Sequence, residues 1–311
     1  MSDRSFSIKR IDPYLDTLSF SYIKKISSGN ITEFLAMSKF PSDFPVRKID
    51  KDHFVFNDTG EVKEFSHSCS KADCYDSVRR SLSVLRGIIN ANCVDPERIR
   101  WCTLTYADNM CDPDVLYRDF QAFWKRFKRY LVSKSLEIPD YISVVEPQAR
   151  GAWHSHLLLI FPSDAPFIDN NSVFYPLWGH GFTKVKAVSN VDNLGAYFSA
   201  YLADLPLDDY ISDRGRCPPP DAVIIDKVID GRPKSFVKGS RLSMYPPGMN
   251  IFRTSRSIKR PVVSLVDPEH FEKEKVSAGT LTFGNGCSVI DDITSESVNT
   301  ICRFYYNSKR K

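Results

Sequence analysis

The chain has 311 residues, of which 42% are hydrophobic and 13% aromatic, so it can bury a sizeable core and is neither disordered nor collagen-like. Its formal net charge of +4 is small, and this total neither requires nor excludes a nucleic-acid partner. No apolar run approaches the roughly 18 residues of a membrane span, and the first residues lack the apolar stretch of a signal peptide.

The eight cysteines are irregularly spaced and form no CxxC pair, which argues against a disulfide framework or a zinc site. The nearest approach to a metal-binding pair is Cys69 with Cys74, which we interpret as two ordinary residues. We therefore expect a reduced, cytoplasmic protein that does not enter a membrane.

Residues 1–70 contain no motif and are predicted to form a variable N-terminal region. From residue 72 to 89, apolar side chains recur at helical spacing, which predicts a helix. Residues 100–106 are rich in β-branched and aromatic side chains and are predicted to form a strand. Asp112 followed by Pro113 is a helix start signal, and the apolar stripe beyond it predicts a helix to about residue 135.

Two further predicted strands, 141–146 and 152–161, are joined by the short segment 147–151, and this arrangement predicts a hairpin. A strand over residues 182–188 and a helix from about 191 to 205 follow. The order of these elements predicts an α+β fold, with a central antiparallel sheet and flanking helices packed on one of its faces.

The segment after the last predicted helix is distinguished by its charge. Residues 214–220 contain three consecutive prolines and are predicted to form a linker. Residues 231–260 carry eight basic residues and no acidic one, interleaved with Phe236, Tyr245 and Phe252. This segment either follows a DNA backbone, with its aromatic rings stacked on unpaired bases, or forms a solvated surface.

We divide the chain into four regions on this basis. They are a variable N-terminal region (1–70), a central domain (71–212), a basic C-terminal extension packed on that domain (213–265) and a tail (266–311).

The candidate metal ligands lie on the predicted hairpin. His154 and His156 are two residues apart in a strand, so their side chains share one face, about 6.6 Å apart. A hairpin centred near Arg150 places Glu146 opposite His154 on that face, roughly 5 Å away. Such a set leaves coordination positions open for water and a phosphate oxygen, and its nitrogen and oxygen donors suit Mn²⁺ or Mg²⁺. The competing interpretation is two structural histidines.

The candidate nucleophiles are Tyr197 and Tyr201, which are four residues apart and hence neighbours on one face of the last predicted helix. A phenol is a competent nucleophile at phosphorus, because the phosphotyrosine ester that it forms can later be reversed by a DNA hydroxyl. The competing interpretation is that both rings belong to the core.

Taken together, these motifs resemble those of the HUH endonucleases, specifically the rolling-circle replication initiators of plasmids and phages. Residues 101–106 resemble the first motif, an apolar strand that contains Thr-Leu-Thr. Glu146 with residues 151–156 resembles the metal motif, and the helix with both tyrosines resembles the nucleophile motif of two-tyrosine members. The resemblance covers roughly residues 75–260 and implies an RRM/ferredoxin-like core.

The resemblance also implies a mechanism. Glu146, His154 and His156 would hold the ion that polarises the scissile phosphate. Tyr201 or Tyr197 would attack in line and leave a 5′-phosphotyrosine and a free 3′-OH, which primes rolling-circle replication. The second tyrosine would close the cycle. The substrate would be single-stranded or hairpin origin DNA, and a host helicase and DNA polymerase would be needed, because the sequence has no GxxxxGK[ST] phosphate loop.

One departure from the pattern concerns lysine. Many relatives carry a lysine three residues after each tyrosine, where this chain has Ala200 and Asp204. The lysine's role of holding the phosphate or ion passes to other basic residues, and Asp204 is a candidate for activating water at termination. The candidate DNA-contacting residues are Lys184, Lys186, Lys238, Arg241, Arg253 and Arg256.

Three alternative functions remain open at this point. A conjugative relaxase or a single-strand transposase uses the same site chemistry and differs only in its DNA substrate. A non-catalytic nucleic-acid-binding module of similar fold predicts no covalent adduct and no need for metal. A metal hydrolase acting on small substrates would use the histidines but leave the tyrosine pair and the basic segment unexplained.

Overall fold

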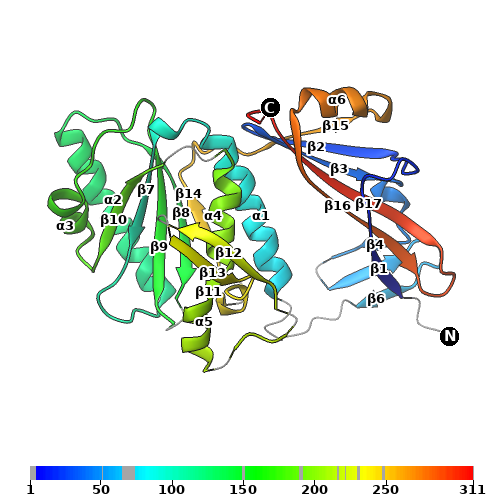
Figure 1. Cartoon of the computed structure of the whole chain (residues 1–311), viewed down its shortest axis with the longest axis horizontal. Coiled ribbons are helices and arrows are strands. Elements are labelled where there is room, and N and C mark those ends of the chain that lie inside the picture. The colour runs from blue at the N-terminus through cyan, green and yellow to red at the C-terminus, as the bar shows by residue number, and fades with distance from the viewer. Residues whose placement is uncertain are drawn as a thin grey trace. The chain divides into compact units, whose positions relative to one another are not determined.

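The computed structural model describes residues 5–50, 52–64, 74–148, 151–188, 192–215, 217–220, 222–229, 232–246 and 249–310. The chain divides into two compact units, which are described separately below and can be located by residue number in Figure 1. We call Ser70–Lys259 the central unit, and Met1–Cys69 together with Arg260–Lys311 the composite unit. Among the described residues, no helix is both long enough and apolar enough to cross a membrane.

The central unit is built on an antiparallel five-stranded sheet with the order β10-β7-β9-β8-β14. Its strands are β7 (Ile99–Leu104), β8 (Asp140–Pro147), β9 (Trp153–Ile160), β10 (Thr183–Ala187) and β14 (Phe252–Thr254). Its helices are α1 (Cys74–Asn92), α2 (Pro113–Ser133), α3 (Tyr175–Trp178), α4 (Leu194–Ala203) and α5 (Leu207–Arg214), with short helical turns η2 (Pro96–Arg98), η3 (Asn170–Phe174) and η4 (Leu242–Met244). The predicted α+β fold with a central antiparallel sheet is confirmed.

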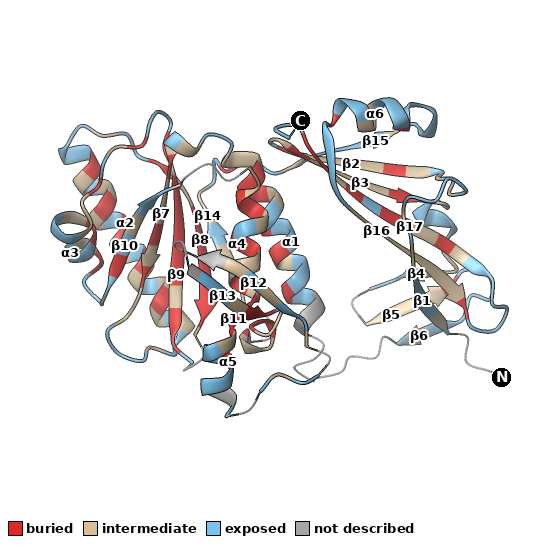
Figure 2. Cartoon of the chain, viewed as in Figure 1, coloured by how far each residue is buried: buried red, intermediate tan, exposed pale blue. Residues whose placement is uncertain are grey.

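Helices cover both faces of this sheet, which corrects the expectation that they pack on one face only. Leu158 of β9 and Val144 of β8 are buried with α1 and α4, which lie side by side. Leu157 and Leu159 point the opposite way and are buried with α2 and α3. The physical reason is that β9 is apolar on both sides below its histidines, and Figure 2 shows the resulting run of buried residues.

The start of α2 follows directly from its sequence. The Asp112 carboxylate accepts hydrogen bonds from the backbone N–H groups of Asp114, at 2.8 Å, and of Val115, at 3.4 Å, and Pro113 occupies the first turn. The predicted apolar stripe is buried, and Phe123 packs against Phe127, with ring centroids 5.8 Å apart. The predicted helix start is confirmed.

A small sheet occupies a region in which the sequence indicated only a linker and a basic surface. It has the order β11-β13-β12, with β11 (Leu205–Pro206), β12 (Ile224–Ile229) and β13 (Arg232–Val237). Phe236 and Tyr245 are buried, so the expectation that these two rings stack on DNA bases is wrong. The alternation of apolar and polar residues in β12 and β13 carries the signal for this hairpin.

The composite unit joins the two ends of the chain in a six-stranded antiparallel sheet, β1-β16-β17-β3-β2-β15, with a separate β4-β5-β6 sheet. Its elements are β1 (Phe6–Ile11), β2 (Tyr22–Ser28), β3 (Ile31–Met37), β4 (Val46–Lys48), β5 (His53–Phe56), β6 (Val62–Glu64), β15 (Val262–Val266), β16 (Thr280–Asp291), β17 (Ser297–Asn307), α6 (Phe271–Ser277), η1 (Pro41–Asp43) and η5 (Pro268–His270). The predicted N-terminal region and tail therefore belong to one unit, because β17 pairs with β3 and β15 with β2.

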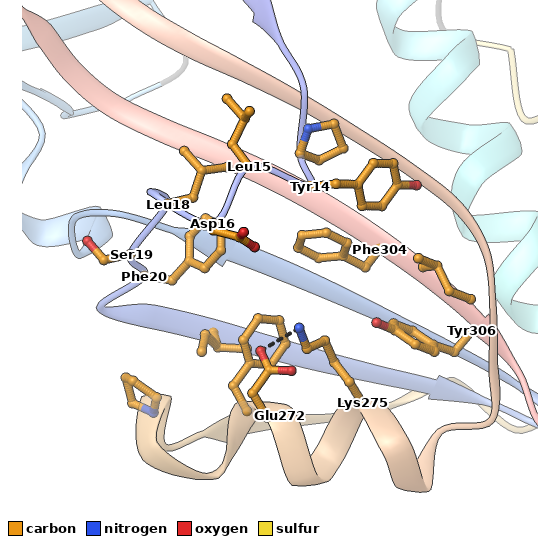
Figure 3. A pocket seen from close by; sticks show the side chains of 15 residues that line it. Tyr14, Leu15, Asp16, Leu18, Ser19, Phe20, Glu272, Lys275, Phe304 and Tyr306 are labelled. Atoms are coloured by element: carbon orange, nitrogen blue, oxygen red, sulfur yellow. Dashed lines mark ion pairs between the residues drawn. The ribbon is translucent and has the colours of Figure 1, made fainter.

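The core of the composite unit is aromatic. Phe271 of α6 packs edge-on against Phe34, with ring centroids 5.4 Å apart, and Phe304 lies beside Phe271 at 6.0 Å. A cavity of about 510 Å³ opens beside this cluster, and Figure 3 shows Tyr14 and Lys275 among its lining residues. Packing of rings under α6 thus fastens the two ends of the chain to each other.

Substituting Phe123→Ala is expected to lower the free energy of unfolding of the central unit by about 3–5 kcal/mol, because it removes a fully buried ring from the face covered by α2. Val132→Ala, on the same helix but with 62% of its surface exposed, should change it by about 0.5 kcal/mol or less. All four tryptophans lie in the central unit, so urea unfolding followed by tryptophan fluorescence measures both variants. Equal losses in the two variants would contradict this packing.

Candidate functional site

The predicted register of the hairpin is confirmed. Glu146 on β8 is the cross-strand partner of His154 on β9, and Val144 is the partner of His156. The predicted centre near Arg150 lies outside the described residues, but Gly151 closes the turn with a φ of 83°, a conformation that favours glycine. Because paired residues point to the same side of a sheet, Glu146, His154 and His156 share one face.

The Glu146 carboxylate is 1% exposed and is held from two sides. Its Oε2 lies 2.7 Å from Nε2 of His156, and its Oε1 lies 2.6 Å from Nη1 of Arg241. Burial opposes ionisation of the carboxyl, but the charge and hydrogen bond of His156, with the charges of Arg241 and His154, outweigh it and lower the pKa of Glu146. Glu146 is therefore an anion at neutral pH.

The other nitrogen of His156 contacts two residues of β7. The indole N–H of Trp101 donates to Nδ1 at 3.4 Å, and the hydroxyl of Thr103 lies 3.4 Å from the same atom. Trp101 is a donor only, whereas a threonine hydroxyl can also accept a hydrogen bond from a protonated Nδ1. The ring can therefore present a bare Nε2 to a metal ion when Thr103 accepts the Nδ1 proton, as metal-ligating histidines require.

The donor atoms were tested against a divalent ion. Among the described residues, no three histidine, cysteine or acidic side chains are grouped closely enough to hold a metal. Two of the three predicted ligands do converge, because Nε2 of His156 and Oε2 of Glu146 are 2.7 Å apart, close to the about 3 Å between neighbouring ligands of an octahedral ion. The pair fits a small divalent ion after a slight separation, with His154 next to it on the same face.

Helix α4 carries the tyrosines and is fixed at its start by α1. The side chain of Asn193 caps the helix by accepting from Ala196 N–H at 3.0 Å, and Asn90 of α1 accepts from Gly195 N–H at 2.8 Å. A Cβ on Gly195 would lie 2.4 Å from the backbone oxygen of Arg86, so only glycine permits this approach. The position of α4 over the sheet is therefore set by close backbone packing.

Tyr197 is 42% exposed, and its ring lies edge-on to Trp101 with centroids 5.8 Å apart. The same indole lies 6.1 Å from the ring of His156, so Tyr197 and His156 flank one tryptophan. Phe198 is buried between Trp101 and His156, which confirms that it supplies packing. Tyr201 belongs to α4, but its side chain lies outside the described part of the structure.

The two predicted DNA-contacting lysines of β10 lie on the site face. Lys184 pairs with Thr103, and Lys186 pairs with Trp101, and both lysines are exposed. Paired residues share a face of the sheet, and Trp101 and Thr103 both contact His156. Lys184 and Lys186 therefore border the His156 side of the site, as phosphate-contacting groups should.

The other predicted DNA contacts are distributed differently. Lys238 and Arg256 are exposed in loops. Arg253 pairs with Ser143 on the opposite face of the sheet and stacks on Tyr117, with its guanidinium carbon 3.7 Å from the ring centroid. Arg241 is only 5% exposed, so the expectation that it lies on a DNA-facing surface is wrong.

Asp204 does not occupy the position expected of a water-activating carboxylate. It ends α4 in an extended conformation and is 4% exposed. Its Oδ1 accepts from Gly239 N–H at 2.9 Å, and its Oδ2 pairs with Lys227 at 2.8 Å. Both oxygens are thus engaged by the small sheet, and the assumption of one further helical turn beyond Tyr201 is corrected by the helix ending at Ala203.

Sequence reasoning missed the roles of Trp101 and Arg241. The period-two alternation of β7 carried a signal for the first, because Trp101 and Thr103 are two residues apart and so share the face of His156. No local pattern distinguishes Arg241 from the exposed basic residues around it.

The segment that carries this geometry is similar to a known protein family. Residues 99–205 match the family model of the replication-associated protein ORF2. The matched segment begins with β7 and ends after α4, so it contains Glu146, His154, His156 and Tyr197. The match supports a role in replication and a DNA partner. No curated protein and no solved structure matches the chain.

Asp204→Ala is expected to lower the free energy of unfolding of the central unit by about 1–3 kcal/mol, because it leaves the buried Gly239 N–H and the Lys227 ammonium without their acceptor. Asp164→Ala, in an exposed loop, is the matched control and should change it by about 0.5 kcal/mol or less. Urea titration measures both. An unchanged stability for Asp204→Ala would argue that its carboxylate is kept for chemistry.

Proposed function

We propose that the protein is a replication initiator that nicks one strand of origin DNA by tyrosine attack. The observation that carries this proposal is the single indole of Trp101, which contacts His156 on one side and the exposed phenol ring of Tyr197 on the other. A nucleophile and a candidate ion-binding pair are thereby held on one face of the sheet. The match of this segment to a replication-associated family supports the same conclusion.

The proposed reaction exchanges one phosphate ester for another. The phenol oxygen of Tyr197 or Tyr201 forms a bond to the scissile phosphorus and loses its proton to solvent. The bond from phosphorus to the 3′ oxygen breaks, and that oxygen takes up a proton to give the free 3′-OH. The products are a 5′-phosphotyrosine and a primer end, and reversal of the same steps rejoins a strand.

The residues around the site have separable tasks in this scheme. A divalent ion, Mn²⁺ or Mg²⁺, held by Glu146, His154 and His156, would polarise the scissile phosphate. Thr103 orients the His156 ring through Nδ1. Lys184 and Lys186, at the exposed edge strand, would contact phosphates beside the scissile one, a task that lysines after the tyrosines perform in the resembling family.

A covalent-adduct assay on single-stranded oligonucleotides tests the proposal. The wild type should form a protein–DNA adduct with Mn²⁺ and none with EDTA. His154→Ala/His156→Ala should abolish the adduct, and whichever of Tyr197→Phe and Tyr201→Phe removes it identifies the first nucleophile. Denaturing gels with labelled DNA measure the yield.

Tyr210→Phe is the matched control for the tyrosine variants, because Tyr210 is buried on α5 away from the sheet face and should leave the adduct unchanged. No adduct on either strand of any origin fragment, with DNA binding intact, would contradict nicking. Adducts formed equally on transfer-origin or transposon-end sequences would indicate a relaxase or a transposase instead.

The double substitution Lys184→Ala/Lys186→Ala should weaken binding of single-stranded DNA and make it less salt-dependent. Two lost phosphate contacts reduce the slope of log K against log[salt] by about 1.4, since each contributes about 0.7 on single strands. Lys125→Ala/Arg129→Ala removes the same charge from exposed positions on α2 and should leave the slope unchanged. Fluorescence anisotropy at several salt concentrations compares them, and equal slopes in both double variants would refute the assignment.

A non-catalytic DNA-binding module is the second candidate, and one observation favours it. Both oxygens of Glu146 are already engaged by protein groups, His156 and Arg241, as in a structural ion pair. This function predicts DNA binding that is indifferent to EDTA and to substitution of either tyrosine by phenylalanine. The adduct assay therefore separates the two candidates directly.

A further inference from the structure

Arg241 is the most deeply buried cation in contact with the site. It follows β13 and precedes η4, and 5% of its surface is exposed. A buried guanidinium is costly unless all its directions are satisfied, and here it donates to three acceptors. It lies outside the segment that matches the replication-associated family, which ends at residue 205.

The three acceptors come from the two elements that build the site. The guanidinium contacts Oε1 of Glu146 at 2.6 Å and the backbone oxygen of Pro147 at 2.8 Å, both at the end of β8. It also donates to the backbone oxygen of Asp204, the cap of α4, at 3.3 Å. One side chain thus ties the candidate metal carboxylate to the end of the tyrosine helix.

The backbone around Arg241 is fastened to the same helix end. Its own N–H donates to the backbone oxygen of Ala203 at 3.0 Å. Gly239 N–H donates to Asp204, and the hydroxyl of Ser240 accepts from Leu205 N–H at 3.2 Å. The guanidinium therefore starts from a fixed point, so that its contact with Glu146 positions the carboxylate and not the arginine.

We propose that Arg241 is a positioning residue for the nicking reaction, and this inference rests on the proposed function. By occupying Oε1, it turns Oε2 toward His156 and restricts Glu146 to binding an ion through one oxygen. By bonding Asp204, it fixes the distance between that carboxylate and the helix of Tyr197. A planar guanidinium performs both tasks at once, whereas the single ammonium of a lysine performs only one.

The test compares Arg241→Gln and Arg241→Lys with the wild type in the full chain. Binding of Mn²⁺ is measured from the loss of the free-ion signal in electron paramagnetic resonance, and adduct formation is measured against Mn²⁺ concentration. Arg126→Gln is the matched control, because Arg126 on α2 donates to the backbone oxygens of Leu177 and Trp178 on the far face of the sheet. Urea unfolding of every variant records its stability.

Arg241→Gln should weaken Mn²⁺ binding about tenfold or more, the usual effect of removing a partner of a metal ligand. The Mn²⁺ concentration for half-maximal adduct formation should rise in parallel, with partial recovery in Arg241→Lys. Mn²⁺ binding in folded Arg241→Gln equal to that of Arg126→Gln would overturn the inference, as would tighter binding, which would make Arg241 a competitor of the ion.

The two measurements keep the inference distinct from the proposed function. If the wild type binds Mn²⁺ but forms no adduct, the nicking function fails while the comparison of Mn²⁺ affinities still decides the role of Arg241 toward Glu146. If the wild type forms an adduct but binds no Mn²⁺, nicking stands and the positioning role is overturned. Should Arg241→Gln fail to fold, Arg241→Lys carries the same comparison.

Discussion

The buried Glu146 carboxylate is the interaction on which the rest of the central unit depends. An anion that is almost fully removed from water needs charged or hydrogen-bonding partners on every side. Here His156 and Arg241 supply them, and each partner brings one layer of the fold with it. His156 connects the carboxylate to β7 through Trp101 and Thr103, and Arg241 connects it to the end of α4. The constraints on one carboxylate therefore align sheet, helix and candidate ion position.

The part of the site that could be predicted from sequence is the part governed by local geometry. Alternation along β9 and a short hairpin suffice to place Glu146 opposite His154, and the structure has this register. The cap of α2 is equally local, because Asp112 and the N–H groups that it accepts are within three residues. Tyr197 also follows from helical spacing, although the exposure of its ring does not.

The features that sequence analysis missed depend on contacts between distant segments. Whether a basic residue faces the site depends on strand register, which places Lys184 beside Thr103 and Arg253 on the opposite face. Arg241 reaches Glu146 across 95 positions of sequence (241 − 146), and charge alone marked it as exposed. The pairing of β17 with β3 likewise joins segments that share no local pattern, so the composite unit was interpreted as an arm and a tail.

The central claim is that α4 and the Glu146–His156 pair form one nicking centre. Its most direct test is tandem mass spectrometry of the protein after reaction with origin DNA and Mn²⁺, nuclease trimming of the DNA and proteolysis. The account predicts a nucleotide 5′-phosphate esterified to Tyr197 or Tyr201 in the α4 peptide. A nucleotide on a residue elsewhere in the chain, or an α4 peptide that is always unmodified, would contradict it.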